Sequence, residues 1–192
     1  ADVVEKIGLP CFVKPSLGGS SFGVTKVKKT EDIQPAIAKA FDEADEVVIE
    51  AFLDGTEISC GCYKVKGKNV VLPITEVVSH NEYFDYDAKY NGQVEEITPA
   101  RIPDEVRNRV WALTSAVYDI IGAQGIIRID YFITEGTKIN LLEVNTTPGM
   151  TATSFIPQQV RAAGLDIKDV MTEIIEDKLG TLPLTPPCGG RV

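Results

Sequence analysis

The chain has 192 residues, of which 44% are hydrophobic and 24% are charged, as in an ordinary globular protein of one large or two small domains. Its net charge of −9 argues against a nucleic acid as the ligand, and no apolar stretch approaches the roughly 20 residues that cross a bilayer. A small polyanionic ligand stays open, provided that a few cations or metal ions gather around it.

The cysteines give no sign of a metal or redox centre. None of the four has zinc-binding spacing, and the C-x-C pair at residues 60 and 62 fits neither a redox nor a zinc pattern. We predict small buried hydrophobes at Cys11, Cys60, Cys62 and Cys188. Free thiols of this kind suit a reducing, cytoplasmic compartment.

The pattern of apolar residues predicts an α+β fold with mostly antiparallel strands and helices packed on them. A helix end before Gly8 opens the chain and suggests that something upstream is missing, whereas the Pro- and Gly-rich residues 181–192 are expected to form a loose tail. The predicted elements between them are, in chain order, a strand–turn–strand unit at 11–27, a helix at 30–44, two strands in 46–65, a strand region at 68–79, a loop at 79–98, a helix at 103–121, strands at 125–133 and 138–145, and helices at 156–163 and 167–179.

Two of these elements stand out. The loop at 79–98 is long and rich in aromatic residues, which favours a functional segment over a disordered one. The helix at 103–121 is the clearest in the chain, because its apolar residues recur at three- and four-residue spacing. The expected buried stripe consists of Val106, Val110, Leu113, Val117 and Ile121.

An acidic residue interrupts each of the strands at 125–133 and 138–145, and the two acids are expected to face each other. If residues 135–138 form a four-residue hairpin turn, Asp130 lies opposite Glu143 and Arg128 lies opposite Asn145, all on one face. Opposed residues have Cβ atoms about 5 Å apart, so two carboxylates there repel each other unless a proton or a cation lies between them. With the amide oxygen of Asn145 beside them, this donor set suits Mg²⁺.

The alternative is a solvated surface on which Arg128 neutralises both acids. The alternate residues of both strands are also apolar, which indicates that both faces of the hairpin are covered and favours the metal site. The prediction depends on the register, because a slip of one residue would send one acid to the other face.

A glycine-rich turn follows the first predicted strand. It lacks the G-x-x-x-x-G-K-[ST] spacing of a P-loop, and a strand follows it instead of a helix. Its backbone N–H groups could still fold over phosphate oxygens, with Lys14 on the preceding strand beside them. Glycine-rich hairpins without a ligand are common, so a plain hairpin stays open.

A series of motifs runs in order from about residue 1 to 180: Lys14 before PSLGGSSFG, then VVIEAFLDGTE, YDAKY, RIDYF and EVNTTPGMTATSFIP. Together these motifs resemble those of the D-alanine–D-alanine ligases, which are ATP-grasp enzymes. The resemblance implies a subdomain with the glycine-rich hairpin at 1–57 and a catalytic subdomain at 58–180, two antiparallel-sheet-plus-helix units that sandwich the nucleotide. It also implies that the family's N-terminal domain, which contacts the first D-alanine, is missing here.

The resemblance assigns roles to the residues that match the family's motifs. The implied ligands of ATP are Lys14 and Lys89 at the phosphates, Glu50, Ala51 and Leu53 at the adenine, and Glu57 at the ribose. The implied ligands of two Mg²⁺ ions, with Mn²⁺ as an alternative, are Asp130, Glu143 and Asn145. The implied catalytic and substrate residues are Arg128 and Gly149 at the oxyanion, Ser154 and Phe155 at the carboxylate of the second amino acid, and Ser20 and Tyr90 for closing the loop over the site.

The implied reaction joins two D-alanines for peptidoglycan precursors. ATP phosphorylates the carboxylate of the first D-alanine, and the amine of the second attacks the acyl phosphate and expels phosphate. A relative that adds D-lactate or D-serine is one alternative, although Tyr90 is more typical of D-alanine ligases. A fragment that binds nucleotide without turnover is another.

We expect this chain alone to bind Mg-ATP but to make little or no dipeptide. The expected partners are ATP and D-alanine, with neither a nucleic acid nor a membrane, and the family's usual homodimer stays open.

Overall fold

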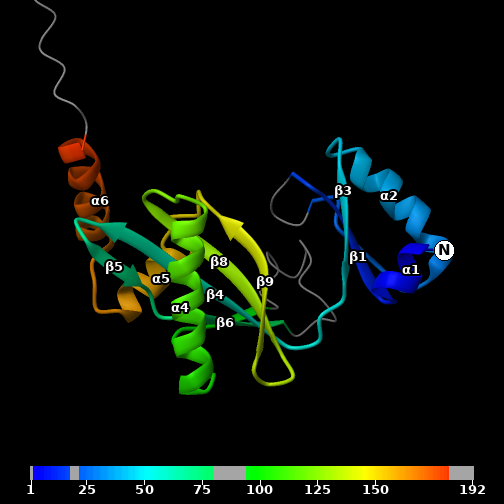
Figure 1. The fold of residues 1–192 in the computed structure, drawn as a ribbon, viewed down its shortest axis with the longest axis horizontal. Helices are drawn as coiled ribbons and strands as arrows, with labels where there is room; N and C mark the ends of the chain where they lie inside the picture. The colour runs from blue at the N-terminus through cyan, green and yellow to red at the C-terminus, as the bar shows by residue number, and fades with distance from the viewer. Residues whose placement is uncertain (1, 18–21, 80–93, 182–192) are drawn as a thin grey trace, which may run out of the picture. The chain divides into compact units, whose positions relative to one another are not determined.

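The computed structural model describes residues 2–17, 22–79 and 94–181, and Figure 1 draws it as a ribbon. The chain divides into two compact units, residues 1–55 with 78–95 and residues 56–77 with 96–192. Two sheets with helices account for them, so the α+β class expected from the sequence is confirmed. The predicted boundary after residue 57 stays a prediction, and nearly all of the predicted tail lies outside the described residues.

The first sheet has three strands in the order β2-β1-β3, and β1 pairs antiparallel with both neighbours. Alternate residues of β1 point to opposite faces, so Cys11 and Val13 are buried with α2 while Phe12 and Lys14 lie on the other face. The elements are α1 (Asp2–Ile7), β1 (Cys11–Pro15), β2 (Thr25–Val27), the 3-10 helix η1 (Thr30–Asp32), α2 (Ile33–Phe41) and β3 (Val47–Ala51).

The second sheet has six strands in the order β7-β6-β4-β8-β9, and β5 pairs with β4. The strand β4 pairs antiparallel with β5, β6 and β8, and β8 pairs antiparallel with β9. The elements of this part of the chain are β4 (Thr56–Val65), β5 (Lys68–Val71), β6 (Thr75–Ser79), β7 (Val94–Ile97), α4 (Asp104–Ile120), β8 (Ile126–Thr134), β9 (Lys138–Asn145), α5 (Phe155–Ala162) and α6 (Ile167–Thr181).

Helices cover both faces of the second sheet (Figure 1). Even-numbered residues of β4, such as Cys60, join a core with Val106 and Val110 of α4. Odd-numbered residues of β4, such as Tyr63, join a second core with α5 and α6. Burial on both sides explains why the central strands are almost continuously apolar.

The helix predicted at 103–121 is confirmed, but the predicted buried stripe is partly wrong. Leu113 and Ile121 are exposed, and the buried positions are Val106, Val110, Thr114 and Tyr118. The polar atoms of the last two are satisfied in place, because the Thr114 hydroxyl shares a hydrogen bond of 2.9 Å with the Tyr131 hydroxyl and Tyr118 donates to the Gly125 carbonyl at 2.9 Å. Hydrophobicity alone therefore misplaced the stripe towards larger aliphatic side chains.

The hairpin of β8 and β9 differs from the prediction at its turn. The turn has three residues, 135–137, instead of the predicted four, and Glu135 and Gly136 both have positive φ. The shorter turn shifts the pairing next to it by one residue, so Thr134 lies opposite Lys138. An irregularity between Asp130 and Tyr131 leaves Leu142 as the extra residue of β9 and shifts the register back.

Three further expectations, on a strand region, a loop and the cysteines, can be compared with the described residues. The strand region at 68–79 contains two strands, and the predicted loop at 79–98 ends in a strand, β7; residues 80–93 lie outside the described part. Cys11, Cys60 and Cys62 are free and buried, as predicted, and Cys188 lies outside the described part. Burial raises the pKa of the Cys60 thiol to about 12 and that of Cys62 to about 11, so neither forms a thiolate readily at neutral pH.

Candidate active site

The two acids face each other on neighbouring strands of the second sheet. Asp130 lies opposite Glu143, and Arg128 lies opposite Asn145, so the predicted pairing is confirmed. The β-bulge at Leu142 is what restores this pairing after the shorter turn. The opposite face of β8 is occupied by Ile127 and Ile129, which are fully buried, so one side of the hairpin is core and the other holds the polar set.

Arg128 and Asp130 form a partly enclosed ion pair. Their side chains are 15% and 9% exposed, and an Arg128 terminal nitrogen lies 2.7 Å from Asp130 Oδ2. Arg128 Nε also donates to Asp130 Oδ1 at 3.0 Å, and the Ser59 hydroxyl donates to the same oxygen at 2.7 Å. Glu143 is more open, with 56% exposure, and lies 3.7 Å from Arg128. Arg128 thus neutralises mainly Asp130. The alternative interpretation expected Arg128 to neutralise both acids.

The start of α5 adjoins this pair. The guanidinium carbon of Arg128 lies 5.2 Å from the centre of the Phe155 ring, within the range of a cation–π contact. Ser154 is the N-cap residue of α5, and its Oγ accepts the Thr151 N–H at 3.2 Å. A side chain at Gly149 would meet that Oγ, because an ideal Cβ there lies 2.8 Å from it. The structure therefore brings Arg128, Phe155, Ser154 and Gly149 into one region of the second unit.

The donor set of the hairpin fits a divalent cation only in part. Asp130, Glu143 and Asn145 offer oxygen ligands from adjacent strands, and Mg²⁺ commonly takes one or two carboxylates together with substrate phosphates. Among the described residues, no three acidic, cysteine or histidine side chains gather as a metal cage. Asn145 Oδ1 already accepts the Thr147 N–H at 3.1 Å. The hairpin thus offers some, but not all, of the oxygen ligands that a divalent cation needs.

The residues predicted to bind the nucleotide fall on both units. In the first unit, Lys14 on β1 and Glu50 on β3 form an ion pair of 2.8 Å with exposures of 24% and 35%. Both lie on the face of the first sheet opposite α2, because Lys14 alternates with buried Val13 and Glu50 pairs with Phe12. If one contacts phosphate and the other adenine, as the resemblance implies, the pair has to separate when ATP binds.

The other residues predicted to bind the nucleotide lie at the end of β3, shortly after it, or on β4. Ala51 ends β3 and is exposed, while Leu53 follows it and is half-buried. Glu57 lies on β4 of the second unit, opposite Phe132. Three predicted site residues, Ser20, Lys89 and Tyr90, lie outside the described residues.

Some residues near these sites escaped the sequence analysis. The centre of the Phe52 ring lies 6.2 Å from that of the Phe12 ring. The Lys26 ammonium lies 4.2 Å from the centre of the Phe52 ring. In the second unit, Ser59 was missed although it anchors Asp130. Alternation of Ser59 with Cys60 signals a polar position on one face of β4, but its partner 71 residues away has no local signal.

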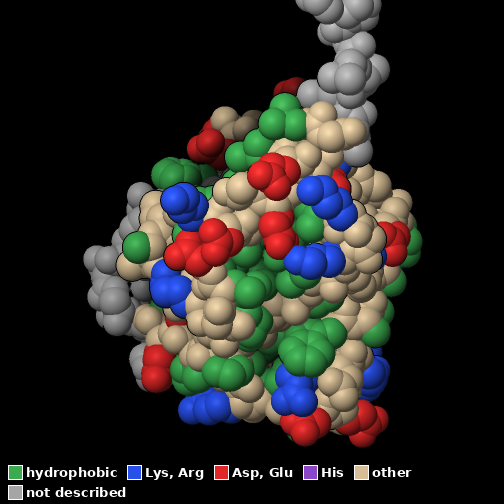
Figure 2. All heavy atoms as spheres, turned by 90° about the vertical axis from the view of Figure 1, so that its left-hand side faces the viewer, with side chains coloured by type: hydrophobic (Ala, Val, Ile, Leu, Met, Phe, Trp, Pro, Cys, Tyr) green, Lys and Arg blue, Asp and Glu red, His purple; other side chains and the backbone are tan. Residues whose placement is uncertain are grey.

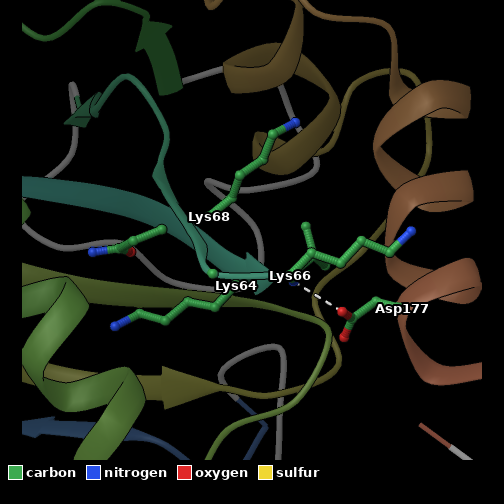
Figure 3. A pocket seen from close by; sticks show the side chains of 7 residues that line it. Lys64, Lys66, Lys68 and Asp177 are labelled. Atoms are coloured by element: carbon green, nitrogen blue, oxygen red, sulfur yellow. Dashed lines mark hydrogen bonds between the residues drawn. The ribbon is translucent and has the colours of Figure 1, made fainter. Parts of the chain in front are cut away.

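A hollow in the second unit holds none of the predicted site residues. It lies at the β4–β5 hairpin, has a volume of about 340 Å³ and is lined partly by Lys64, Lys66 and Lys68 (Figure 3). These lysines point in different directions, Lys64 pairs with Asp119, and Lys68 pairs with Glu173. Figure 2 shows basic and acidic side chains interspersed on that side of the molecule. The hollow therefore lacks the focused positive charge of an anion site.

Comparison with known proteins decides the family. Residues 1–176 match the family model described as "D-ala D-ala ligase C-terminus". The chain belongs to the D-alanine–D-alanine ligase family. The D-alanine–D-alanine ligase of Bacteroides fragilis is 80% identical over 177 residues, which are 92% of this chain and 55% of that protein. The corresponding ligase of Phocaeicola vulgatus is 75% identical over 177 residues, with the same shares. The chain spans about half the length of the curated ligases it matches.

Solved ligase structures have the same fold. The D-Ala:D-Ser ligase VanG from Enterococcus faecalis is 32% identical with a TM-score of 0.78, over 91% of this chain and 51% of that one. The D-alanine–D-alanine ligase from Bacillus anthracis is 33% identical with a TM-score of 0.76, over 93% of this chain and 57% of that one. The ATP-grasp class expected from the sequence is thereby confirmed. Among the described residues, no helix has the length and apolar character needed to cross a membrane.

Proposed function

We propose that this chain is the nucleotide-binding and catalytic part of a ligase that joins two D-alanines at the expense of ATP. The observation that carries the proposal is the pairing of Asp130 with Glu143 beside Arg128 and the start of α5. The Bacillus anthracis ligase, 33% identical to this chain, has been solved complexed with ATP. Such a reaction would belong to the cytoplasmic synthesis of peptidoglycan precursors.

The chain's own residues would divide the work between charge and position. Asp130, Glu143 and Asn145 would hold Mg²⁺, which neutralises charge on the transferring phosphoryl group when bound. Arg128 is already oriented by Asp130 and Phe155, so it would meet developing negative charge with little rearrangement. Ser154 and the N–H groups at the start of α5 would bind the carboxylate of the second amino acid.

In the first unit, Lys14 would leave Glu50 for a phosphate oxygen. The exchange is inexpensive, because both side chains are partly solvated and such pairs contribute little to stability. Glu50 would then be free to accept a hydrogen bond from the adenine amino group. Three further residues enter the proposal from the sequence alone. Lys89 would contact phosphate, and Ser20 and Tyr90 would help to close the loop over the site.

D-Alanine is the acceptor that we propose, and D-serine and D-lactate are the alternatives. The curated ligases at 75–80% identity are D-alanine–D-alanine ligases. VanG, a D-Ala:D-Ser ligase, has a fold as similar as that of the Bacillus anthracis enzyme, so the fold does not discriminate between acceptors. Measuring phosphate release with D-alanine, D-serine and D-lactate in turn identifies the acceptor.

The first experiment measures Mg-ATP binding by calorimetry. We expect the chain to bind Mg-ATP and the double variant Asp130→Asn, Glu143→Gln to lose this affinity, since it keeps the shape of both side chains but removes their charge. Equal affinity of the double variant and the parent chain would rule out the proposed metal site. A titration of ATP in EDTA is the control for binding without a divalent cation.

The second experiment measures turnover. Phosphate release with D-alanine is compared between this chain and a fusion in which the first part of the Bacteroides fragilis ligase precedes it. We expect the fusion to turn over and the chain alone to show little or no activity. A nucleotide-binding fragment without turnover predicts an inactive fusion. Sedimentation of both proteins tests whether either forms the homodimer that the sequence analysis left open.

A further inference from the structure

One edge of β4 has a gap between its two partner strands. Residues 57–59 pair with β6 and residues 62–65 pair with β5. Between them, the Gly61 carbonyl accepts the N–H of Leu72, just after β5, at 2.9 Å, but the Gly61 N–H has no partner in either strand. The side-chain amide of Gln159 on α5 lies in this gap. Its Oε1 accepts the Gly61 N–H at 2.9 Å, and its Nε2 donates to the Ser59 carbonyl at 2.9 Å. The amide thus takes the place of a peptide group from a missing neighbour strand.

The Gln159 side chain is fully buried and fully used. Its Nε2 also donates to Thr75 Oγ1 at 3.0 Å, so both of its hydrogens and its oxygen have partners. Close packing around Gly61 leaves little room for adjustment, because an ideal Cβ there would lie 2.8 Å from Gln159 Oε1. Removing the amide would leave a buried N–H and a buried carbonyl of β4 without partners, which proteins rarely tolerate.

The contacts of Gln159 close a ring around the candidate active site. Ser59, whose carbonyl binds Gln159, donates its hydroxyl to Asp130 at 2.7 Å, and Asp130 holds Arg128. The guanidinium of Arg128 lies over the ring of Phe155. Phe155 and Gln159 are four residues apart on α5 and so share one face of that helix. One turn of α5 is therefore tied to the site at both of its ends.

We propose that Gln159 is a positioning residue, which fixes α5 against β4 so that Arg128 and the helix start at Ser154 keep their places for the second amino acid. This inference rests on the proposed ligase function, but its structural half can be tested without turnover. Gln159 makes no hydrogen bond to a residue proposed to bind ATP or Mg²⁺, whereas its own helix, α5, begins at the residues proposed to bind the second amino acid. Its largest effect should therefore fall on the acceptor side of the reaction.

The structural half is tested on this chain by nuclear magnetic resonance. The variant Gln159→Met keeps the length of the side chain and its contact with the apolar core but removes all three hydrogen bonds. We expect hydrogen exchange at Arg128 Nε to become about tenfold faster, because a loosened α5 lets the Arg128–Asp130 pair open more often. Unchanged amide exchange in α4 would show that the chain is still folded. Unchanged exchange at Arg128 in Gln159→Met would overturn the proposal.

The control is the same substitution one residue earlier. Gln158 donates to the Thr153 carbonyl and to Glu96, and it makes no hydrogen bond to β4. Gln158→Met is expected to leave exchange at Arg128 Nε unchanged. Equal acceleration in both variants would mean that any loss on α5 disturbs Arg128, and it would also overturn the specific role of Gln159.

The functional half uses the fusion described above. In Gln159→Met, the KM for the acceptor amino acid should rise about tenfold while the KM for ATP changes less than about twofold. A lower melting temperature with both KM values unchanged would reduce Gln159 to a stabilising residue. If the fusion with Gln159 intact makes no dipeptide, the ligase proposal fails, whereas the exchange result on Arg128 stands by itself.

Discussion

Two ion pairs on the two sheets differ in how much of the protein surrounds them. In the second unit, Arg128 and Asp130 are held by Ser59, by the Phe155 ring and through Gln159. In the first unit, the side chains of Lys14 and Glu50 are 24% and 35% exposed, against 15% and 9% for Arg128 and Asp130. The difference matters because removing one partner of an enclosed pair costs much free energy of folding, whereas a solvated pair can exchange a partner at little cost.

This contrast matches the two tasks proposed for the pairs. An enclosed arginine keeps one geometry before and after the substrate arrives, which is what stabilisation of developing charge requires. A solvated lysine can leave its carboxylate when a phosphate is offered. Glu76 and Arg101 form a third pair, in which the carboxylate is nearly buried and the arginine is mostly exposed. The three pairs form a graded series that mutation can test.

Asp130→Ala should have the largest effect on stability. It leaves the partly enclosed Arg128 charge with Glu143, at 3.7 Å, in place of Asp130, so we expect a loss of about 3 kcal/mol. Urea unfolding at pH 7 measures the change. Asp130→Asn, which keeps an acceptor for Ser59, should cost less. A loss in Asp130→Ala no greater than that in Lys14→Met would contradict the contrast between the two pairs.

Gly61→Ala tests the enclosure without touching a charge. The added Cβ would lie 2.6 Å from Ile156 Cδ1 and would press α5 away from β4, at a cost of about 1–3 kcal/mol. Gly180→Ala is the matched control, because it adds the same methyl group on α6 with no atom within 4 Å, and it should be neutral or slightly stabilising. Equal unfolding midpoints for the two variants would show that α5 is loosely seated.

Glu76→Gln should have an intermediate effect that depends on pH. Hydrogen bonds from the Arg101 side chain hold the pKa of the Glu76 carboxyl below its ordinary value. Because the folded-state pKa is lowered, the carboxylate stabilises the protein above the unfolded-state pKa, and this contribution is lost as the pH falls through the folded-state pKa. We expect a loss of about 1 kcal/mol at pH 7, discounted for the exposed arginine. Urea unfolding from pH 7 to 3.5 should show the two curves converging below about pH 4.5.

Lys14→Met and Glu50→Gln should have the smallest effect on stability. A double-mutant cycle is expected to give a coupling free energy below about 0.5 kcal/mol. Lys14→Met should nevertheless weaken Mg-ATP binding about tenfold, because a charged hydrogen bond to phosphate is lost. Lys39→Met, which removes the same charge from the exposed side of α2, is the calorimetric control. Equal losses of affinity would mean that net charge, and not Lys14, attracts the nucleotide.

Local sequence patterns predicted the main elements and the pairing of the two acids. The pairing was predicted correctly, but the turn from which it was predicted has a different length. A four-residue turn was expected, and the turn has three residues. The bulge at Leu142 compensates by one residue, so Asp130 still faces Glu143. Simple alternation cannot anticipate a bulge, because the extra residue, Leu142, is apolar like Leu141 before it and leaves no mark in the pattern.

The support of the site was beyond the reach of the sequence for a different reason. Ser59 meets Asp130 across 71 residues, and Gln159 meets Gly61 across 98 residues. Such contacts depend on which strands become neighbours in the sheet, and no local periodicity encodes that order. Gln159 in particular lies in a helix whose polar residues would ordinarily be assigned to solvent.

The bulge at Leu142 also divides the hairpin into two segments that differ in register by one residue, and β4 pairs with β8 along both of them. A peptide epitope or a fluorescent label introduced at the exposed tip, residues 135–137, would therefore be separated from the acids by strand pairs that β4 also holds. That tip is a natural attachment point for reporting on ligand binding without disturbing it.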